Sequence, residues 1–466
     1  MLEETKFTSF LEMAGLDAKQ HQETGVQWIL EREHTPWMNV RGGIIADEMG
    51  LGKTIMMIGS ILANVTTRTL IVLPLALLNQ WYQEIERTTG IKSLVYHGAI
   101  KSQTPIAVLK AAPIVLTTYG EIQISTDELS TTAHSPIHTI HWGRIVFDEA
   151  HHMRNMRTNK FKGCLALKAQ MRWMMTGTPI QNRNTDLFAL YHVLGFDDSL
   201  YASNMEHCML RRTKEMVGIK ISNLHINDIT IPWSGECEKL LAEDIHSALT
   251  SSGSNTIGFA DGLCGEFSNP RGWKLLLMLR AKQMCVFPKL LEHKFNQFCD
   301  EGFIKTDFTT DEAMKVSSKM DVVTSLLIKR QNNTNRKIVF CHFHIEMDEI
   351  KRRCQMAGLT VKTVDGRLRP HEKAAAMLAP WPDILILQIN TCCEGLNLQD
   401  FNEIYFASPH WNPAVEDQAI ARCHRIGQKK DVHVFRFNMN AINEGCSSQD
   451  NYCIDVQQKK RELYIY

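Results

Sequence analysis

The strongest constraint on the fold is a repeated alternation of short apolar runs with helix-compatible segments. Continuous apolar runs of strand length, separated by helical patterns, predict a parallel sheet covered by helices on both faces. In such sheets ligands bind beyond the carboxyl ends of the strands. The runs of the first half are Gly43–Ala46, Thr69–Leu73, Pro113–Tyr119, Arg144–Asp148 and Arg172–Gly177.

A second series of the same kind begins near Ser318. Its runs are Lys337–Cys341, Thr360–Val364, Ile384–Gln388, Glu403–Phe406 and Val432–Phe437. Between the two series the pattern degrades into helix-compatible segments and a loop rich in Gly, Ser and Asn. The sequence therefore predicts an α/β protein with an N-terminal lobe (1–215), a mostly helical insertion and linker (216–316), a second lobe (317–445) and a short tail (446–466).

The composition limits the classes of partner. With 51 basic and 51 acidic residues, the chain must meet a polyanion through a local groove rather than through its overall charge. No apolar run reaches the roughly 18 residues that a bilayer crossing needs, so we expect no membrane partner. The 13 cysteines include no CxxC pair, which favours reduced thiols and no structural zinc.

Residues 46–54, Ala-Asp-Glu-Met-Gly-Leu-Gly-Lys-Thr, are termed the phosphate loop below; they follow the first run and open a helix. A glycine-rich turn at a helix N-terminus presents backbone N–H groups to an anion. Gly50 and Gly52 let the backbone approach phosphates, Lys53 can reach the β- and γ-phosphates, and the Thr54 hydroxyl suits Mg²⁺. Since the complete pattern has Gly where this chain has Asp, a turn without a ligand is the alternative.

Two charged features have uses in phosphoryl transfer. Asp148 can hold Mg²⁺ through water and Glu149 can orient and deprotonate an attacking water, although a solvated acidic turn is the alternative. Arg422 and Arg425 are three apart, so on a helix they share one face. The second half has no phosphate loop, and two guanidiniums supplied from it would complete a site in the first half.

Four phrases occur in the order typical of superfamily-2 helicase motors: Asp47–Thr54, Asp148–His151, Thr176–Asn182 and Gln418–Gln428. The chain specifically resembles the Swi/Snf-related DNA-dependent ATPases, whose hallmarks also include His21–Gly25, Leu210–Lys214 and Trp411–Pro413. The resemblance covers residues 15 to 440. It implies two RecA-like lobes, a DEAH box at 148–151 and a nearly bare motor, of a kind that occurs in a compact or viral genome.

The resemblance also implies the residues of an ATP site with Mg²⁺. Nucleotide contacts are implied for Gln22, which would contact adenine, and for Asp47, Glu48, Met49, Gly50, Leu51, Gly52, Lys53, Thr54 and Gln418. The implied catalytic groups are Lys53, Asp148, Glu149, Arg422 and Arg425. Thr54 and Asp148 would be the metal ligands.

The implied activity is ATP-driven movement on double-stranded DNA, with salt-sensitive contacts mainly to phosphate. Implied DNA contacts are Pro74, Asn79, Gln80, Trp81, Thr117, Thr118, Arg211, Arg212, Lys214, Asn397 and Trp411. A strand-separating RNA or DNA helicase and a non-catalytic DNA-binding scaffold are the alternatives. Chromatin or a replication or transcription complex is the expected partner, in the nucleus or at a site of viral DNA replication or transcription, such as a viral factory, or in the virion.

Overall fold

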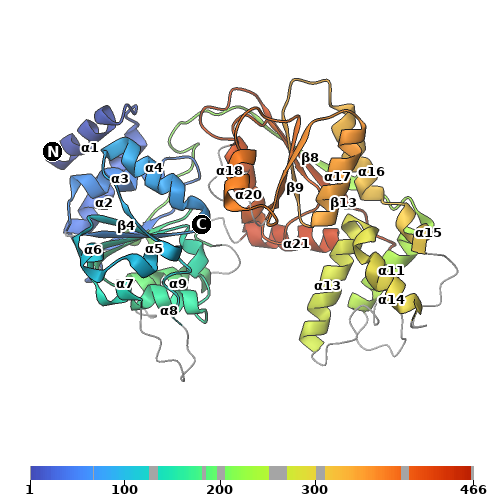
Figure 1. Ribbon diagram of the computed structural model, residues 1–466, viewed down its shortest axis with the longest axis horizontal. Helices are drawn as coiled ribbons and strands as arrows, with labels where there is room; N and C mark the ends of the chain where they lie inside the picture. Colours follow the sequence, from blue (N-terminus) through green and yellow to red (C-terminus); the bar gives the residue numbers. More distant parts are fainter. Residues whose placement is uncertain are drawn as a thin grey trace. The chain divides into compact units, whose positions relative to one another are not determined.

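The computed structural model describes residues 2–66, 68–124, 135–180, 185–196, 205–250, 270–300, 310–389 and 398–462. The chain divides into two compact units, which we call the first unit (within residues 1–220) and the second unit (within 221–462). Each unit is built on a parallel sheet with helices on its two faces (Figure 1). The predicted α/β class, with two parallel sheets that are each flanked by helices, is confirmed.

The sheet of the first unit has seven strands in the order β3-β4-β2-β5-β6-β1-β7. They are β1 (Gly42–Ile45), β2 (Thr69–Leu73), β3 (Leu94–Tyr96), β4 (Ile114–Thr118), β5 (His141–Asp148), β6 (Lys168–Met175) and β7 (Met209–Leu210). The helices are α1 (Leu2–Met13), α2 (Gln20–His34), α3 (Lys53–Ala63), α4 (Leu78–Thr89), α5 (Gly98–Gln103), α6 (Ile106–Ala111), α7 (Pro136–Thr139), α8 (Asn159–Ala166), α9 (Thr185–Leu194) and α10 (Met205–Cys208).

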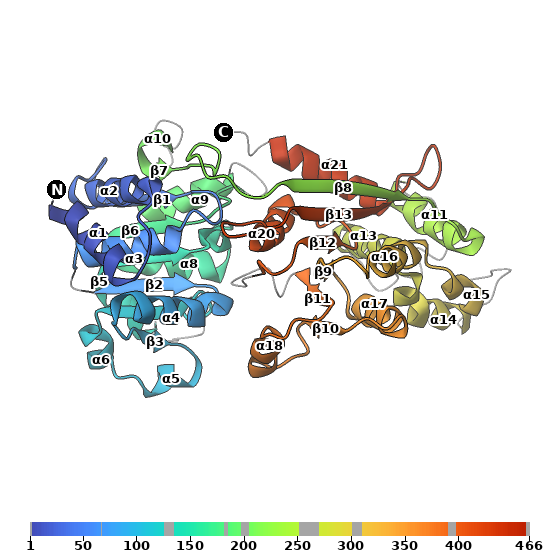
Figure 2. The ribbon, with the colours of Figure 1, turned by 90° about the horizontal axis from the view of Figure 1, so that it is seen from above.

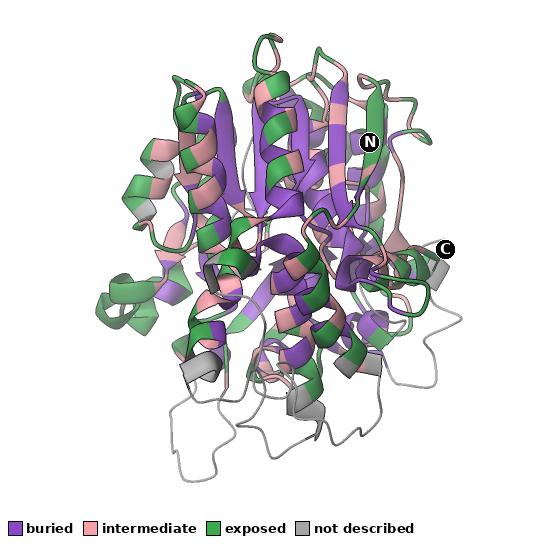
Figure 3. Cartoon of the chain, turned by 90° about the vertical axis from the view of Figure 1, so that its right-hand side faces the viewer, coloured by how far each residue is buried: buried purple, intermediate pink, exposed green. Residues whose placement is uncertain are grey.

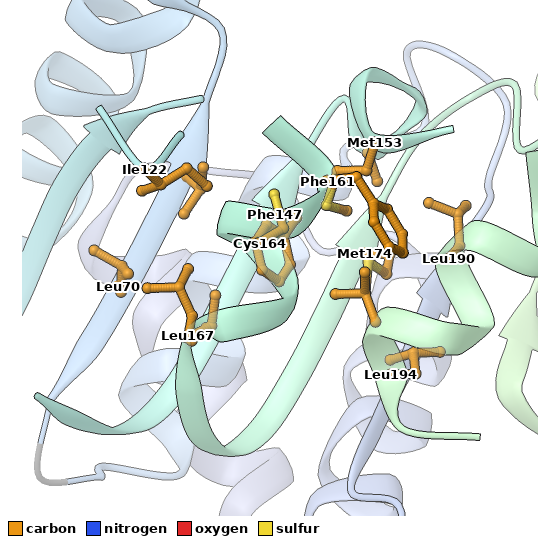
Figure 4. Close-up of a cluster of buried hydrophobic side chains, with 14 of the residues drawn as sticks. Leu70, Ile122, Phe147, Met153, Phe161, Cys164, Leu167, Met174, Leu190 and Leu194 are labelled. Atoms are coloured by element: carbon orange, nitrogen blue, oxygen red, sulfur yellow. The ribbon is translucent and has the colours of Figure 1, made fainter. Parts of the chain in front are cut away.

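Both faces of this sheet are buried, which explains why its strands are apolar without interruption. Successive side chains of a strand point to opposite faces. Leu70 and Val72 of β2 therefore join one core cluster, whereas Ile71 and Leu73 join the other. Figure 4 shows the first cluster between the sheet and helices α8 and α9, with Phe147, Met174 and Leu190 facing one another.

The sheet of the second unit has six strands in the order β10-β11-β9-β12-β13-β8. They are β8 (Leu224–Ile231), β9 (Lys337–Cys341), β10 (Val361–Val364), β11 (Ile384–Gln388), β12 (Glu403–Phe406) and β13 (Val432–Met439). The helices are α11 (Glu236–Thr250), α13 (Pro270–Val286), α14 (Glu292–Asp300), α15 (Thr310–Lys315), α16 (Ser318–Lys329), α17 (His344–Met356), α18 (Pro370–Ala376), α20 (Pro413–Cys423) and α21 (Gln449–Glu462). Figure 3 shows the buried strands between helices whose outer sides are exposed.

One part of the predicted helical insertion is not helical. Residues 224–231 form β8, which pairs in parallel with β13 from Leu224↔Val432 to Ile231↔Met439 and lies beside it in Figure 2. Because β8 is an edge strand and largely exposed, it lacks the continuous apolar run that marks the central strands. The predicted tail likewise contains α21, a helix of the second unit.

Among the described residues, none of the helices combines the length and the apolar character that a bilayer crossing requires.

Candidate nucleotide-binding and catalytic site

Three candidate segments of the first unit follow neighbouring strand ends. Ile45, the last residue of β1, is in register with Met175 at the end of β6, and Met175 is in register with Asp148 at the end of β5. The phosphate loop, the turn after Met175 and the acidic pair therefore meet at one edge of the sheet. This confirms the expectation that polar residues gather at the carboxyl ends of the strands.

The phosphate loop has the backbone conformation that its glycines allow. Gly50 and Gly52 have φ values of 90° and 88°, in the left-handed region that favours glycine. A Cβ on Gly52 would lie 2.2 Å from Nε2 of Gln22, so this position also needs the absence of a side chain. α3 begins at Lys53, directly after Gly52, and its N-terminal N–H groups face the loop.

The Lys53 ammonium lies over the loop. Its Nζ donates to the carbonyl of Asp47 at 2.6 Å and to that of Glu48 at 3.4 Å. A Cβ on Gly177 would lie 3.6 Å from the same Nζ, which brings the turn after β6 against the loop. Thr54 follows in the first turn of α3, and Gln181 and Asn182 lie outside the described residues.

Gln22, the expected adenine contact, is buried on α2 beside the loop. Its Nε2 donates to the Leu51 carbonyl at 3.2 Å, and Nε2 of the adjacent His21 lies 3.0 Å from the same oxygen. Burial lowers the pKa of His21. The N-terminal turn of α2 is thus bonded directly to the phosphate loop.

Asp148 is buried with both carboxylate oxygens oriented. Its Oδ2 accepts from the Trp81 indole at 2.7 Å and its Oδ1 accepts from the Glu149 backbone at 2.9 Å. Burial, with the neighbouring charge of Glu149 as the second cause, raises the pKa of Asp148 to about 6. Glu149 itself has a φ of 49°, and its Oε2 lies 3.3 Å from Nδ1 of His151.

Several predicted DNA contacts are buried in the first unit, which corrects their assignment. Trp81 is only 2% exposed and its one polar atom is bonded to Asp148. Thr117 is fully buried and its hydroxyl donates to the Tyr96 carbonyl at 2.9 Å, while the Thr118 hydroxyl lies 3.3 Å from Nδ1 of His97. Side chains that are buried in this way cannot contact a DNA phosphate.

The other predicted DNA contacts of the first unit differ in exposure. Pro74 is buried, whereas Asn79 and Gln80 are exposed at the start of α4. Arg211 is half-buried. Asn397, which the sequence places in the second lobe, lies outside the described residues.

Arg212 and Lys214 are engaged with the phosphate loop. Nη2 of Arg212 lies 2.5 Å from Oδ2 of Asp47, and Nζ of Lys214 lies 2.8 Å from Oε1 of Glu48. The sequence did offer one signal for this pairing, because position 47 has an aspartate where the usual pattern has glycine. A carboxylate that becomes buried needs a cation as its partner. Because their charges are paired with carboxylates of the loop, the structure does not support the expected DNA contacts of Arg212 and Lys214.

The two candidate catalytic arginines belong to the second unit. α20 ends at Cys423, so Arg425 lies beyond the helix and the predicted shared helix face is wrong. Burial lowers the pKa of Arg425, with the positive charge of Arg422 as a second cause. Gln428 fixes this turn, because its Nε2 donates to the carbonyls of Cys423 (3.2 Å) and Gln399 (2.8 Å).

Gln418 is buried on α20, and among the described residues its Nε2 has no hydrogen-bond partner. Trp411, the expected DNA contact ahead of this helix, is half-buried and packs edge-on against Tyr452 at 5.7 Å between ring centroids.

The segment that leads into α20 is held by two helices outside the recognised motifs. Three successive carbonyls accept from side chains: Pro409 from Lys282 of α13 at 3.1 Å, His410 from Gln457 of α21, and Trp411 from Lys460 of α21 at 3.0 Å. On α20 itself, Asp417 forms a bidentate pair with Arg461 at 2.8 and 2.9 Å. Sequence reasoning missed these supports, since no periodicity or motif marks them.

The chain matches two family models. The SNF2-related domain matches residues 21–201 and the helicase conserved C-terminal domain matches residues 318–427. The chain is 28% identical to the "Probable global transactivator" of Orgyia pseudotsugata multicapsid polyhedrosis virus, over 95% of this chain and 89% of that protein.

Two human proteins are also similar over most of this chain. The "Chromodomain-helicase-DNA-binding protein 7" is 26% identical over 90% of the chain, and the "Helicase-like transcription factor" is 24% identical over 85%. The chain spans only 15% and 50% of these two proteins.

Among solved structures, the chain is similar to "Sulfolobus solfataricus SWI2/SNF2 ATPase core in complex with dsDNA", with 21% identity, a TM-score of 0.40 and coverage of 96% of this chain and 92% of that one. The two family models and the viral and cellular relatives agree with the residues gathered at the phosphate loop. The chain belongs to the SNF2-related family of helicase-like, DNA-dependent ATPases.

Proposed function

We propose that this protein binds ATP on the phosphate loop, hydrolyses it with the acidic pair, and converts the energy into movement along double-stranded DNA. The observation that carries the proposal is the alignment of the loop, the turn after β6 and Asp148 at one sheet edge. Gly50 and Gly52 leave room for phosphates, and the first N–H groups of α3 are suitable donors to them.

The donor set suits Mg²⁺, which prefers hard oxygen ligands and keeps several waters. The Thr54 hydroxyl and the Asp148 carboxylate would hold the ion, and when bound it would neutralise charge on the phosphates. The hydrogen bonds from Trp81 and from the Glu149 backbone keep the Asp148 carboxylate in one orientation for this purpose. Lys53 would exchange its bonds to the loop carbonyls for bonds to phosphate.

Glu149 is the proposed base that orients and deprotonates the attacking water. Its contact with His151, which also approaches the Thr176 hydroxyl at 3.5 Å, links the base to the turn after β6. Arg422 and Arg425 are proposed to stabilise the charge that develops on the transferred phosphoryl group. Gln418 is proposed to contact the nucleotide as well. Its amide nitrogen has no hydrogen-bond partner among the described residues.

For DNA, we propose contacts from the exposed Asn79 and Gln80 and from Arg211 and Trp411. The near full-length similarity to a viral protein named as a global transactivator favours a role in transcription, in the nucleus or at a viral site of DNA transcription.

The test is the rate of ATP hydrolysis by the full chain with duplex DNA, single-stranded DNA or RNA, with Lys53→Ala as the matched inactive variant. We expect duplex DNA to stimulate the wild type most and the variant not at all. Displacement of a third strand from a DNA triplex would report the movement. Equal stimulation by RNA would favour the strand-separating helicase, and no hydrolysis with any nucleic acid would favour the scaffold.

A further inference from the structure

Arg212 joins three segments of the first unit. Its backbone N–H and its Nε both donate to Oδ1 of Asp47, at 3.0 and 3.1 Å, and its Nη2 donates to Oδ2 at 2.5 Å. Its Nη1 donates to the His21 carbonyl at 2.5 Å and to the Thr24 hydroxyl at 3.1 Å, both on α2. One side chain therefore bridges the phosphate loop and the helix that carries Gln22.

This pair is almost removed from solvent. The side chain of Asp47 is fully buried and that of Arg212 is 13% exposed. A bidentate guanidinium–carboxylate pair fixes direction as well as distance, because the two groups match only in one plane. Removal of one partner would leave an uncompensated buried charge at the start of the loop.

The neighbouring residues leave space for this guanidinium. A Cβ on Gly25 would lie 2.8 Å from Nη2 of Arg212 and 2.6 Å from Sδ of Met56. Gly25 lies within α2, where glycine stabilises a helix less than alanine does. The passage of Arg212 between α2 and α3 accounts for a glycine at this position.

The backbone on either side of Arg212 also follows the loop. The N–H groups of Ala46 and Glu48 donate to the carbonyls of Leu210 and Arg212, at 2.7 and 2.9 Å, and Lys214 pairs with Glu48. This segment, 209–214, ends only a few residues before the boundary between the units at 220. The phosphate loop is therefore hydrogen-bonded directly to the segment that leads toward the second unit.

We propose that Arg212 is a positioning residue of the nucleotide site, which holds the phosphate loop and α2 together and ties both to the connecting segment. The inference rests on the function proposed above. It replaces the DNA-phosphate contact that the sequence suggested for this arginine.

The test measures Mg²⁺·ADP binding by calorimetry and duplex-DNA binding across salt concentrations, on the full chain. Arg212→Gln should weaken nucleotide binding by about tenfold, the effect of a lost charged hydrogen bond, and leave the salt slope of DNA binding unchanged. Arg212→Lys should be intermediate. The effects of Arg212→Gln and Asp47→Asn should be less than additive in the double variant, since both remove one interaction.

A second variant guards against a folding defect. Gly25→Ala keeps the arginine and displaces its guanidinium, so we expect the same loss of nucleotide affinity. Glu215→Gln, at an exposed position nearby, is the control that should change neither measurement.

The inference is overturned if Arg212→Gln binds nucleotide within about twofold of the wild type and its salt slope falls by about one, which is the signature of a phosphate contact. Additive effects in the double variant would overturn it as well. Failure of the wild type to bind nucleotide would instead refute the proposed function.

Discussion

The phosphate loop of the first unit and the arginine-bearing end of α20 in the second unit are supported in different ways. The loop is held by residues within the recognised motifs: Lys53 bonds its own loop, Gln22 bonds Leu51, and Arg212 bonds Asp47. The approach to α20 is held by α13 and α21, which contain none of the recognised motifs. The recognised motifs thus contain the residues that support the phosphate loop but not those that support the approach to α20.

This difference has a functional consequence. Support of the loop acts on groups that touch the nucleotide before and after reaction, so its loss should weaken binding. The bonds that hold α20 orient the guanidiniums of Arg422 and Arg425, which we propose to stabilise the charge that develops on the transferred phosphoryl group. Loss of these bonds should therefore lower kcat with little change in KM. The predictions below test this separation, beginning with the largest effect.

The sharpest test is removal of the guanidinium of Arg425. Arg425→Ala should lower kcat by about 10³- to 10⁵-fold, the range typical of an arginine that stabilises phosphoryl-transfer charge. Binding of Mg²⁺·ADP should stay within a few-fold of the wild type, in contrast to Lys53→Ala, which loses both. Single-turnover hydrolysis and calorimetry measure the two quantities. Hydrolysis at the wild-type rate would show that Arg425 has no part in the chemistry.

The next effect concerns the bonds between α20 and α21, which lie close to each other in Figure 1. Arg461→Gln removes the bidentate pair with Asp417, and Gln457→Ala removes the donor to Glu416 and to the His410 carbonyl. Because these bonds orient the helix ahead of Arg422, each variant should lower kcat about tenfold with KM for ATP nearly unchanged.

Lys459→Ala is the matched control for this prediction, since Lys459 is exposed on the same helix. Its kcat should equal that of the wild type. If Arg461→Gln raised KM as much as it lowered kcat, the idea that α21 acts through the orientation of α20 would be wrong.

A smaller effect tests whether Trp81 positions the Asp148 carboxylate or contacts DNA. Trp81→Phe keeps the buried ring and removes the indole donor to Asp148, so we expect a several-fold lower kcat with unchanged DNA affinity. Asn79→Ala, on the exposed turn of the same helix, should instead weaken DNA binding. Paired measurements of hydrolysis and DNA affinity test both variants, and weaker DNA binding by Trp81→Phe would restore the original expectation.

The sequence identified the phosphate loop more readily than the residues that hold the loop in place, for a physical reason. Gly50, Gly52 and Lys53 are identified by local conformation and charge, which depend on near neighbours in the chain. The Trp81–Asp148 and Arg212–Asp47 bonds join residues 67 and 165 positions apart, and only the folded sheet brings them together. β8 was missed because an edge strand is not buried on both faces, and the end of α20 ahead of Arg425 depends on a turn fixed by Gln428.

The last prediction compares the two regions by pH. Burial lowers the pKa of His410 to about 4, with the charges of Lys282 and Lys460 as further causes, and also lowers that of His342, whose ring stacks on His410. The unfolded chain binds a proton near pH 6.5 and the native state does not, so stability is lost as pH falls from 6.5 toward 4. The raised pKa of Asp148 has the opposite sign, because its native carboxyl binds a proton more readily than the unfolded one.

Acid should therefore weaken the segment ahead of α20 without weakening the first unit through Asp148. His410→Gln should remove about 2 kcal/mol of the stability lost between pH 7.5 and 5, which is the linkage expected for a pKa shift from 6.5 to about 4. Urea unfolding of the wild type and the variant at both pH values measures this. His371→Gln is the control, because His371 is exposed in the same unit. An equal loss in all three proteins would mean that the acid sensitivity originates elsewhere in the chain.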